Sequence, residues 1–207
     1  MTGFQLKLLA MIAMTLDHIG CIFFPRLPLL RMIGRLAMPI LCFFIGEGLR
    51  HTRNPQKYLL RLVGFALISE LPFDLAFYGR VNWASQNVYF TLALGLLALR
   101  LLQSSSPRRW AGLLAVGGAA LLLRADYGLY GIAMILLLDR FRDSLSEQFA
   151  SLALLNLLLF GFGMQSLSLL SLPLLCLYNG QRGCDDKKFF YAYYPAHLLL
   201  LWGLGSV

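Results

Sequence analysis

The sequence has few charged residues and none of the motifs that mark common soluble enzymes. Only 14% of its 207 residues are Asp, Glu, Lys or Arg. Its four cysteines form no CxxC pair and show no metal-ligand spacing, so no metal site is predicted. The sequence contains no Walker loop, zinc-protease motif, GxSxG elbow or dinucleotide fingerprint. These absences argue against nucleotide-dependent, zinc-dependent and serine-hydrolase chemistry.

Hydrophobic residues are abundant instead, at 58% of the chain, and the mean hydropathy is +0.68. A soluble domain of this length has too much surface to tolerate that balance, so we expect the excess apolar surface to face lipid. The sequence predicts an all-α, polytopic transmembrane helix bundle that forms a single domain over residues 1–207. The net charge of +8 does not indicate a nucleic-acid partner, because membrane proteins retain Lys and Arg on the cytoplasmic side.

Nine apolar segments are long enough, or nearly so, to cross a bilayer. We expect helices at about residues 5–24, 30–49, 57–78, 87–102, 110–124, 127–139, 148–163, 165–179 and 188–205. The fifth and sixth are short, and residues 110–139 could instead form one re-entrant hairpin. With the N-terminus in the cytoplasm, the outer side receives only Arg26, Arg31, Arg80 and Arg124. Arg35 lies within the second segment, and all other Lys and Arg residues are placed on the cytoplasmic side. This excess supports the orientation.

Polar residues within these segments are expected to gather at one depth, toward the outer side. A charge in the bilayer costs several kcal/mol, so each requires an explanation. Five segments contribute to the set, which contains Asp17, His18, Arg35, Glu70, Asp74, Asn87, Thr91, Asp126 and Tyr127. Such convergence is typical of a cavity. The alternative is that these groups only pair with one another, for example Arg35 with Asp17 or Glu70, and so lock helices together.

His18 is the leading candidate for chemistry, because imidazole can accept and return a proton near neutral pH. Lys7 precedes it by eleven residues, which places both on one helical face about 16 Å apart along the axis. His197 follows a proline in the last segment and is a second candidate base. The tyrosines at 191, 193 and 194 could equally form an interfacial aromatic belt. A basic cluster, Arg50, Arg53, Lys57 and Arg61, could bind phosphates or simply anchor the cytoplasmic side.

Several runs of residues resemble the TraX family, in the same order and over nearly the whole chain. They include Lys7–Ala10 through Asp17–Gly20, Ile33–Pro39, Phe44–Gly48, Asn87–Leu92, Asp126–Gly131 and Tyr194–Leu198. The family takes its name from a conjugative-plasmid protein that acetylates the N-terminus of the major pilin subunit. The sequence is also similar to a wider group of transmembrane acyltransferases, in which ten residues separate a basic residue from an essential histidine. Lys7 and His18 match that spacing.

The resemblance implies a membrane acyltransferase, in the bacterial inner membrane, that uses acetyl-coenzyme A and no metal. Lys7 and the Arg50–Arg61 cluster would hold the donor's phosphates, with His18 as general base and His197 as a second base or a donor contact. Arg35, Asn87 or Thr91 would stabilise the oxyanion. Asp17, Glu70, Asp74 or Asp126, with Tyr127 nearby, would orient the base or hold the acceptor. That acceptor would be an amine or hydroxyl of a peptide N-terminus, glycan or lipid. A transporter and a non-catalytic pilus or envelope assembly factor are the alternatives.

Overall fold

The computed structural model describes residues 1–184 and 187–205, except for the side chain of Lys187. Within these ranges the chain is helical and contains no strand. One isolated bridge pairs Gln86 with Ala125. The prediction of an all-α protein is therefore confirmed. The chain divides into two compact units, residues 1–41 with 141–207, and residues 42–140. They are called the first and second unit below and are described separately.

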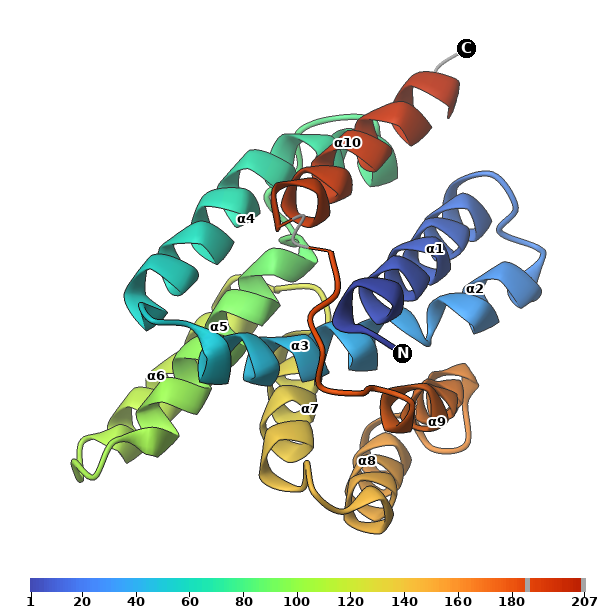
Figure 1. Cartoon of the computed structure of the whole chain (residues 1–207). Helices are drawn as coiled ribbons and strands as arrows, with labels where there is room; N and C mark the ends of the chain where they lie inside the picture. The colour runs from blue at the N-terminus through green and yellow to red at the C-terminus, as the bar shows by residue number, and fades with distance from the viewer. Residues whose placement is uncertain (185–186, 206–207) are drawn as a thin grey trace. The chain divides into compact units, whose positions relative to one another are not determined.

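The first unit contains both ends of the chain. Its elements are α1 (Gly3–Ile22), α2 (Pro28–Gly34), the start of α3 (Ala37–His51), α8 (Leu145–Phe160), the 3-10 helix η1 (Met164–Leu170), α9 (Ser171–Cys176) and α10 (Lys187–Gly205). Helix α1 packs against both α2 and α10, and α8 packs against η1 and α9 (Figure 1). Residues from helices far apart in the sequence therefore meet on α1.

Helices α1 and α2 approach each other closely because each presents a glycine to its neighbour. A Cβ atom at Gly34 would lie 2.2 Å from the Cβ of Asp17, and one at Gly20 would lie 2.8 Å from the Cβ of Leu30. Small residues of this kind let helix backbones approach without a side chain between them. This packing positions Asp17 beside the end of α2.

The second unit comprises the rest of α3, α4 (Pro55–Tyr78), α5 (Val88–Gln103), α6 (Arg109–Leu122) and α7 (Gly128–Arg140). Helix α5 is its centre, because α4, α6 and α7 all pack against it. Asn side chains at positions 54 and 87 cap α4 and α5 by accepting backbone N–H bonds, as expected of this residue at a helix start. Gly79 ends α4 in the left-handed conformation.

The observed helices differ from the predicted segments at two places. The second predicted helix is interrupted at Arg35 and Leu36, which form a turn between α2 and α3. The prediction that Arg35 lies inside a helix is therefore wrong. The eighth predicted helix, residues 165–179, consists of η1 followed by the six-residue α9. Pro173 lies inside this segment and lacks the backbone N–H that a continuous α-helix would bond to the carbonyl of residue 169.

Among the described residues, two helical stretches, Gly3–Ile22 and Pro28–His51, are long and apolar enough to cross a membrane. Four further apolar helices, Val88–Gln103, Arg109–Leu122, Leu145–Phe160 and Met164–Cys176, are shorter. Helix α4 has sufficient length but carries Lys57, Arg61, Glu70 and Asp74. The prediction of nine spans is thus not confirmed, although the apolar helices are consistent with membrane association. Residues 110–139 form two helices, α6 and α7, which pack against each other.

Candidate functional site

The first unit brings two histidines from opposite ends of the chain into direct contact. His18 on α1 and His197 on α10 face each other with 2.8 Å between Nδ1 of His18 and Nε2 of His197. Their ring planes are nearly parallel, at 9°, and the ring centroids lie 5.1 Å apart. His197 is buried and His18 is partly buried. The sequence did not predict this pair, because His18 and His197 lie 179 positions apart and no local pattern links them.

The surroundings of His197 determine how protons are arranged on the pair. Its Nδ1 lies 3.0 Å from the backbone carbonyl of Tyr193, and a carbonyl can only accept a hydrogen bond. His197 therefore carries its proton on Nδ1, and its Nε2 accepts from Nδ1–H of His18. In the neutral pair, this assigns the basic lone pair to Nε2 of His18. A fixed tautomer of this kind is how a general base is oriented in enzymes.

A second hydrogen-bond chain ties the same two helices together. The Thr15 hydroxyl lies 2.9 Å from the carbonyl of Met11, to which it donates, and 2.6 Å from the Tyr193 hydroxyl. The Tyr193 hydroxyl therefore donates to Thr15. The ring of Tyr193 lies nearly parallel to that of His197, with 5.0 Å between centroids. Tyr193 thus supports His197 through its ring, its carbonyl and its contact with α1.

An ion pair lies one residue away from His18 on α1. The Arg35 guanidinium donates to Oδ1 of Asp17 at 2.6 Å and to Oε1 of Gln165, on η1, at 3.0 Å. It also donates from Nε to the carbonyl of Arg31 at 3.2 Å. Both charged side chains are mostly shielded, with 13% of Arg35 and 17% of Asp17 exposed. This bears out the interpretation that Arg35 pairs with Asp17 and links helices. The roles predicted for them in catalysis stay predictions.

The second unit contains its own buried polar group, centred on Asn87 and Glu70. The Asn87 amide donates to Oε2 of Glu70 and, at 2.8 Å, to the carbonyl of Ala66. The backbone N–H of Asn87 also points to Oε2 of Glu70, at 3.3 Å. Asn87 is fully buried, so its amide is held as a structural donor to α4. Oxyanion stabilisation by this amide, which the sequence predicted, would require those bonds to be exchanged.

Other predicted residues of the second unit lie in the segments around this group. Asp74 accepts from the backbone N–H of Asn82 at 2.8 Å and is 2% exposed. The Thr91 hydroxyl donates to the backbone carbonyl of Asp126. Tyr127 adopts a positive φ of 63° and its ring lies 6.2 Å from that of Tyr130. The contacts of this unit therefore connect α4, α5 and the loop before α7.

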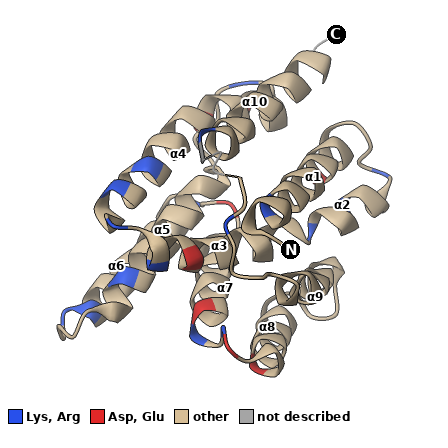
Figure 2. Cartoon of the chain, in the orientation of Figure 1, with Lys and Arg blue, Asp and Glu red and all other residues tan. Residues whose placement is uncertain are grey.

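The predicted donor-binding cations occupy different local environments. The Lys7 ammonium lies 5.5 Å from the centroid of the Phe190 ring, so α1 and α10 meet here as well. Arg53, Lys57 and Arg61 are exposed residues at or near the start of α4, and Arg61 lies over the ring of Tyr58. Figure 2 shows basic residues gathered along this part of α4 and at the turn between α5 and α6. Such a surface suits an anion such as a phosphate or carboxylate.

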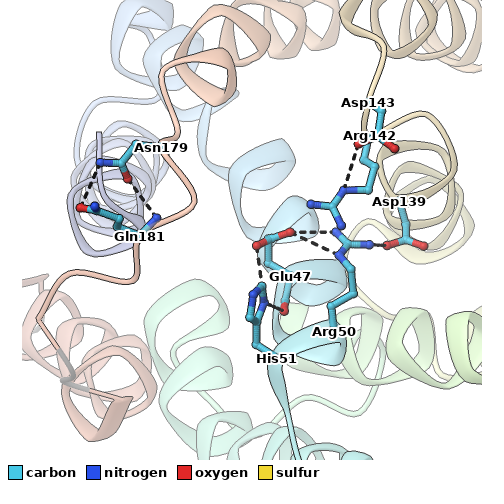
Figure 3. Close-up of polar contacts among 8 residues, drawn as sticks. All are labelled: Glu47, Arg50, His51, Asp139, Arg142, Asp143, Asn179 and Gln181. Atoms are coloured by element: carbon cyan, nitrogen blue, oxygen red, sulfur yellow. Dashed lines mark hydrogen bonds and ion pairs between the residues drawn. The ribbon is translucent and has the colours of Figure 1, made fainter.

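Arg50 differs from the other members of its predicted cluster because it already has anionic partners. It donates to Glu47 at 3.0 Å, one turn earlier on α3, and to Asp139 on α7 (Figure 3). His51 lies beside the same Glu47, with Nδ1 2.9 Å from its carbonyl. A phosphate would have to compete with two carboxylates for Arg50. Its observed contacts fasten α3 to α7.

Sequence reasoning missed two residues of the first unit, Thr15 and Gln165. Thr15 lies three residues before His18 and so shares a helical face with it, a signal that could have identified it. Gln165 carries no such signal, because η1 brings it to Arg35 only in the folded unit. Among the described residues, no group of three or more His, Cys, Asp or Glu could hold a metal ion.

Comparison with known proteins relates this chain to one protein family over nearly its whole length. The sequence profile described as TraX protein matches residues 2–205. The probable fimbrial assembly protein FimC, serogroup H1, of Dichelobacter nodosus is 36% identical, with 97% of this chain and 94% of that protein covered. Protein TraX of Escherichia coli is 27% identical, over 95% of this chain and 84% of that protein. The uncharacterized protein RP591 of Rickettsia prowazekii (strain Madrid E) is 61% identical over 45% of this chain and 36% of its own length. No solved structure matches the chain significantly.

Proposed function

Because the chain belongs to the TraX family, we propose that it is a membrane acyltransferase of pilus or fimbrial assembly. The names of two relatives, TraX and a probable fimbrial assembly protein, support the biological setting. The contact between His18 and His197 carries the chemical part of the proposal. It joins the first and last helices of the chain around one imidazole with an assigned basic nitrogen. We place the protein in the bacterial inner membrane with acetyl-coenzyme A as donor.

The reaction is an acetyl transfer from the donor's thioester to an amine or hydroxyl acceptor. Nε2 of His18 takes a proton as the acceptor atom attacks the thioester carbonyl. The tetrahedral intermediate then collapses, the carbon–sulfur bond breaks, and the proton passes from His18 to the departing thiolate. His197 stabilises the charged imidazole by accepting from its Nδ1–H. The acetyl group ends on the acceptor, and coenzyme A leaves as the free thiol.

The Asp17–Arg35 pair is suited to positioning rather than to proton transfer. Asp17 accepts from Arg35, and Gln165 holds the same guanidinium from a third helix. These bonds fix the turn of α1 that carries His18. Lys7 lies on the same face of α1 and could contact the donor's phosphates.

The first experiment measures donor binding, because the acceptor need not be known. Purified protein in detergent or nanodiscs is titrated calorimetrically with coenzyme A, and with pantetheine as a phosphate-free comparison. Saturable binding that weakens for pantetheine is expected. Folded protein that binds neither compound would contradict the proposal. Transfer of labelled acetyl groups to a peptide with a free N-terminal amine then tests the reaction.

A non-catalytic assembly factor is the second candidate, and the name of the Dichelobacter nodosus relative, a probable fimbrial assembly protein, favours it. The two candidates differ in what they require of His18. An enzyme needs its imidazole, whereas an assembly factor needs only a folded bundle. Pilus assembly is therefore measured in cells that carry His18→Ala at wild-type protein levels. Unchanged pilus assembly in these cells would support the assembly factor.

A further inference from the structure

The exposed face of α4 begins with a group of cations. Lys57 and Arg61 are exposed and four residues apart, so they lie on one face of the helix, and exposed Arg53 lies in the turn just before it. These three residues are called the basic end of α4. No Asp or Glu occurs in the sequence between Glu47 and Glu70, so no acidic residue close in sequence accompanies them. The start of α4 therefore presents concentrated positive charge (Figure 2).

The same face of α4 is apolar beyond the basic end. Leu60, Leu67 and Leu71 recur at helical spacing and are each more than half exposed; they are called the leucine stripe. Gly64 lies among them, and a Cβ atom there would meet nothing within 4 Å. Exposed apolar surface of this kind marks a contact with lipid or with another protein. Along the axis, Leu71 lies about 15 Å beyond Arg61, which is half the hydrocarbon thickness of a bilayer.

A phospholipid has the same order of charged and apolar parts as this face. A soluble anion would engage the basic end but leave the leucine stripe uncovered, and an apolar protein helix would do the reverse. The last turn of α5 adds a further cation at the charged end, because Arg100 donates to Oε1 of Gln56, in the first turn of α4, at 2.9 Å. Charge complementarity therefore favours an amphiphile with an anionic head.

Helix α8 shows that an exposed apolar surface need not begin at cations. Its residues Leu154 and Leu158 are each more than half exposed, yet its first turn carries the acidic Glu147. That carboxylate would repel an anionic headgroup, whereas the basic end of α4 would attract one. The combination of charge and apolar surface thus distinguishes α4 from α8.

We propose that this face of α4 binds an anionic phospholipid, with its phosphate at the basic end and an acyl chain along the leucine stripe. Cations at a membrane surface attract anionic lipids, and an Arg guanidinium can donate two parallel N–H bonds to one phosphate. The site is separate from the acyl transfer, for which Lys7 on α1 is the proposed contact with the donor's phosphates.

The test uses the full-length protein in nanodiscs made of equal parts phosphatidylglycerol and phosphatidylcholine with the same acyl chains. Native mass spectrometry of the released protein counts the lipids of each kind that stay bound. We expect phosphatidylglycerol to be retained at least about fivefold more, the contribution of a single cation. Equal retention of the two lipids would overturn the proposal. This comparison needs no variant, so it is informative even if substitutions unfold the protein.

Competition separates the lipid from a soluble phosphate. Coenzyme A and glycerol phosphate carry phosphate groups but no acyl chains, so an excess of either is expected to leave the phosphatidylglycerol in place. Displacement of the lipid by either compound would assign the basic end to a soluble anion and overturn the proposal. Binding of coenzyme A elsewhere, without displacement, agrees with separate donor and lipid sites.

Substitutions then locate the site. Lys57→Gln and Arg61→Gln are each expected to lower the preference for phosphatidylglycerol about fivefold. Leu67→Asn should lower its retention as well, because the acyl chain loses an apolar contact. Arg80→Gln, just beyond the other end of α4, and Leu158→Asn on α8 are matched controls at exposed residues and should retain lipid as wild type. Unchanged retention in the site variants, or an equal fall in the controls, would overturn the assignment to α4. Because the readout is bound lipid, failure of acetyl transfer would leave the result intact.

Discussion

The two units bury carboxylates in contrasting ways. In the first, Asp17 faces the guanidinium of Arg35, so the anion has a cation as direct partner. In the second, Glu70 and Asp74 are held by the neutral donors of Asn87 and Asn82. A buried charge needs both hydrogen bonds and charge compensation. The first arrangement is complete within the unit, whereas the second has hydrogen bonds but no cation against it among the described residues. Asp17 is therefore a structural carboxylate balanced by a cation, while the described partners of the pair on α4 are neutral.

The largest effect is expected when the proposed base of the first unit is removed. His18→Ala should lower acetyl transfer by roughly 10²–10⁴-fold, the usual contribution of a general base. His197→Ala should cost less, because His18 would keep its imidazole and lose only its fixed tautomer. His51→Ala is the matched control, at a mostly exposed histidine of the second unit. Wild-type rates for His18→Ala, measured with labelled donor, would remove it from the mechanism.

Loss of the compensating cation should strongly destabilise the first unit. Arg35→Met leaves Asp17 shielded without its main partner and is expected to cost about 3–5 kcal/mol of unfolding free energy. Glu70→Gln should change stability by less than about 1 kcal/mol, since it removes a charge with which no described cation pairs. Unfolding by denaturant titration of both proteins in the same detergent gives the comparison. Equal losses in the two variants would contradict the distinction between the units.

The close approach of α1 and α2 can be tested without changing any charge. Gly34→Ala places a Cβ where the side chain of Asp17 now lies, so the helices must separate. The expected cost is about 1–3 kcal/mol. Gly64→Ala is the matched control, because a Cβ there meets nothing within 4 Å. Thermal unfolding midpoints of the two variants should therefore differ clearly. Similar midpoints would mean that α1 and α2 tolerate a wider spacing.

The smallest effect is expected for the link between Thr15 and Tyr193. Tyr193→Phe keeps the ring and the backbone carbonyl that holds His197 but removes the hydroxyl that donates to Thr15. Stability should fall by about 1 kcal/mol, the typical value of one hydrogen bond. Acetyl transfer should fall only slightly, because the His18–His197 contact remains. A loss as large as that of His18→Ala would assign Tyr193 a direct part in the chemistry.

Much of the helical layout could be predicted from local sequence. Runs of apolar residues, ended by proline, glycine or polar loops, located most helices to within a few residues. The break at Arg35 and the 3-10 segment were missed, because both depend on local backbone choices that hydropathy does not report. The number of membrane-spanning helices was harder to predict, and the nine expected spans are not confirmed. Helices of 13 and 14 residues, α7 and α6, are shorter than a bilayer-crossing segment usually is.

The sequence by itself determined the residue types of the candidate site, the shared face of Lys7 and His18, and that of Glu70 and Asp74. These follow from helical periodicity, which is a local property of the chain. Only the tertiary structure decided that His18 meets His197, that Arg35 pairs with Asp17, and that Gln165 joins them. Such contacts depend on packing between helices distant in sequence. It also decided which carboxylate has a cation beside it and which oxygens remain without a donor.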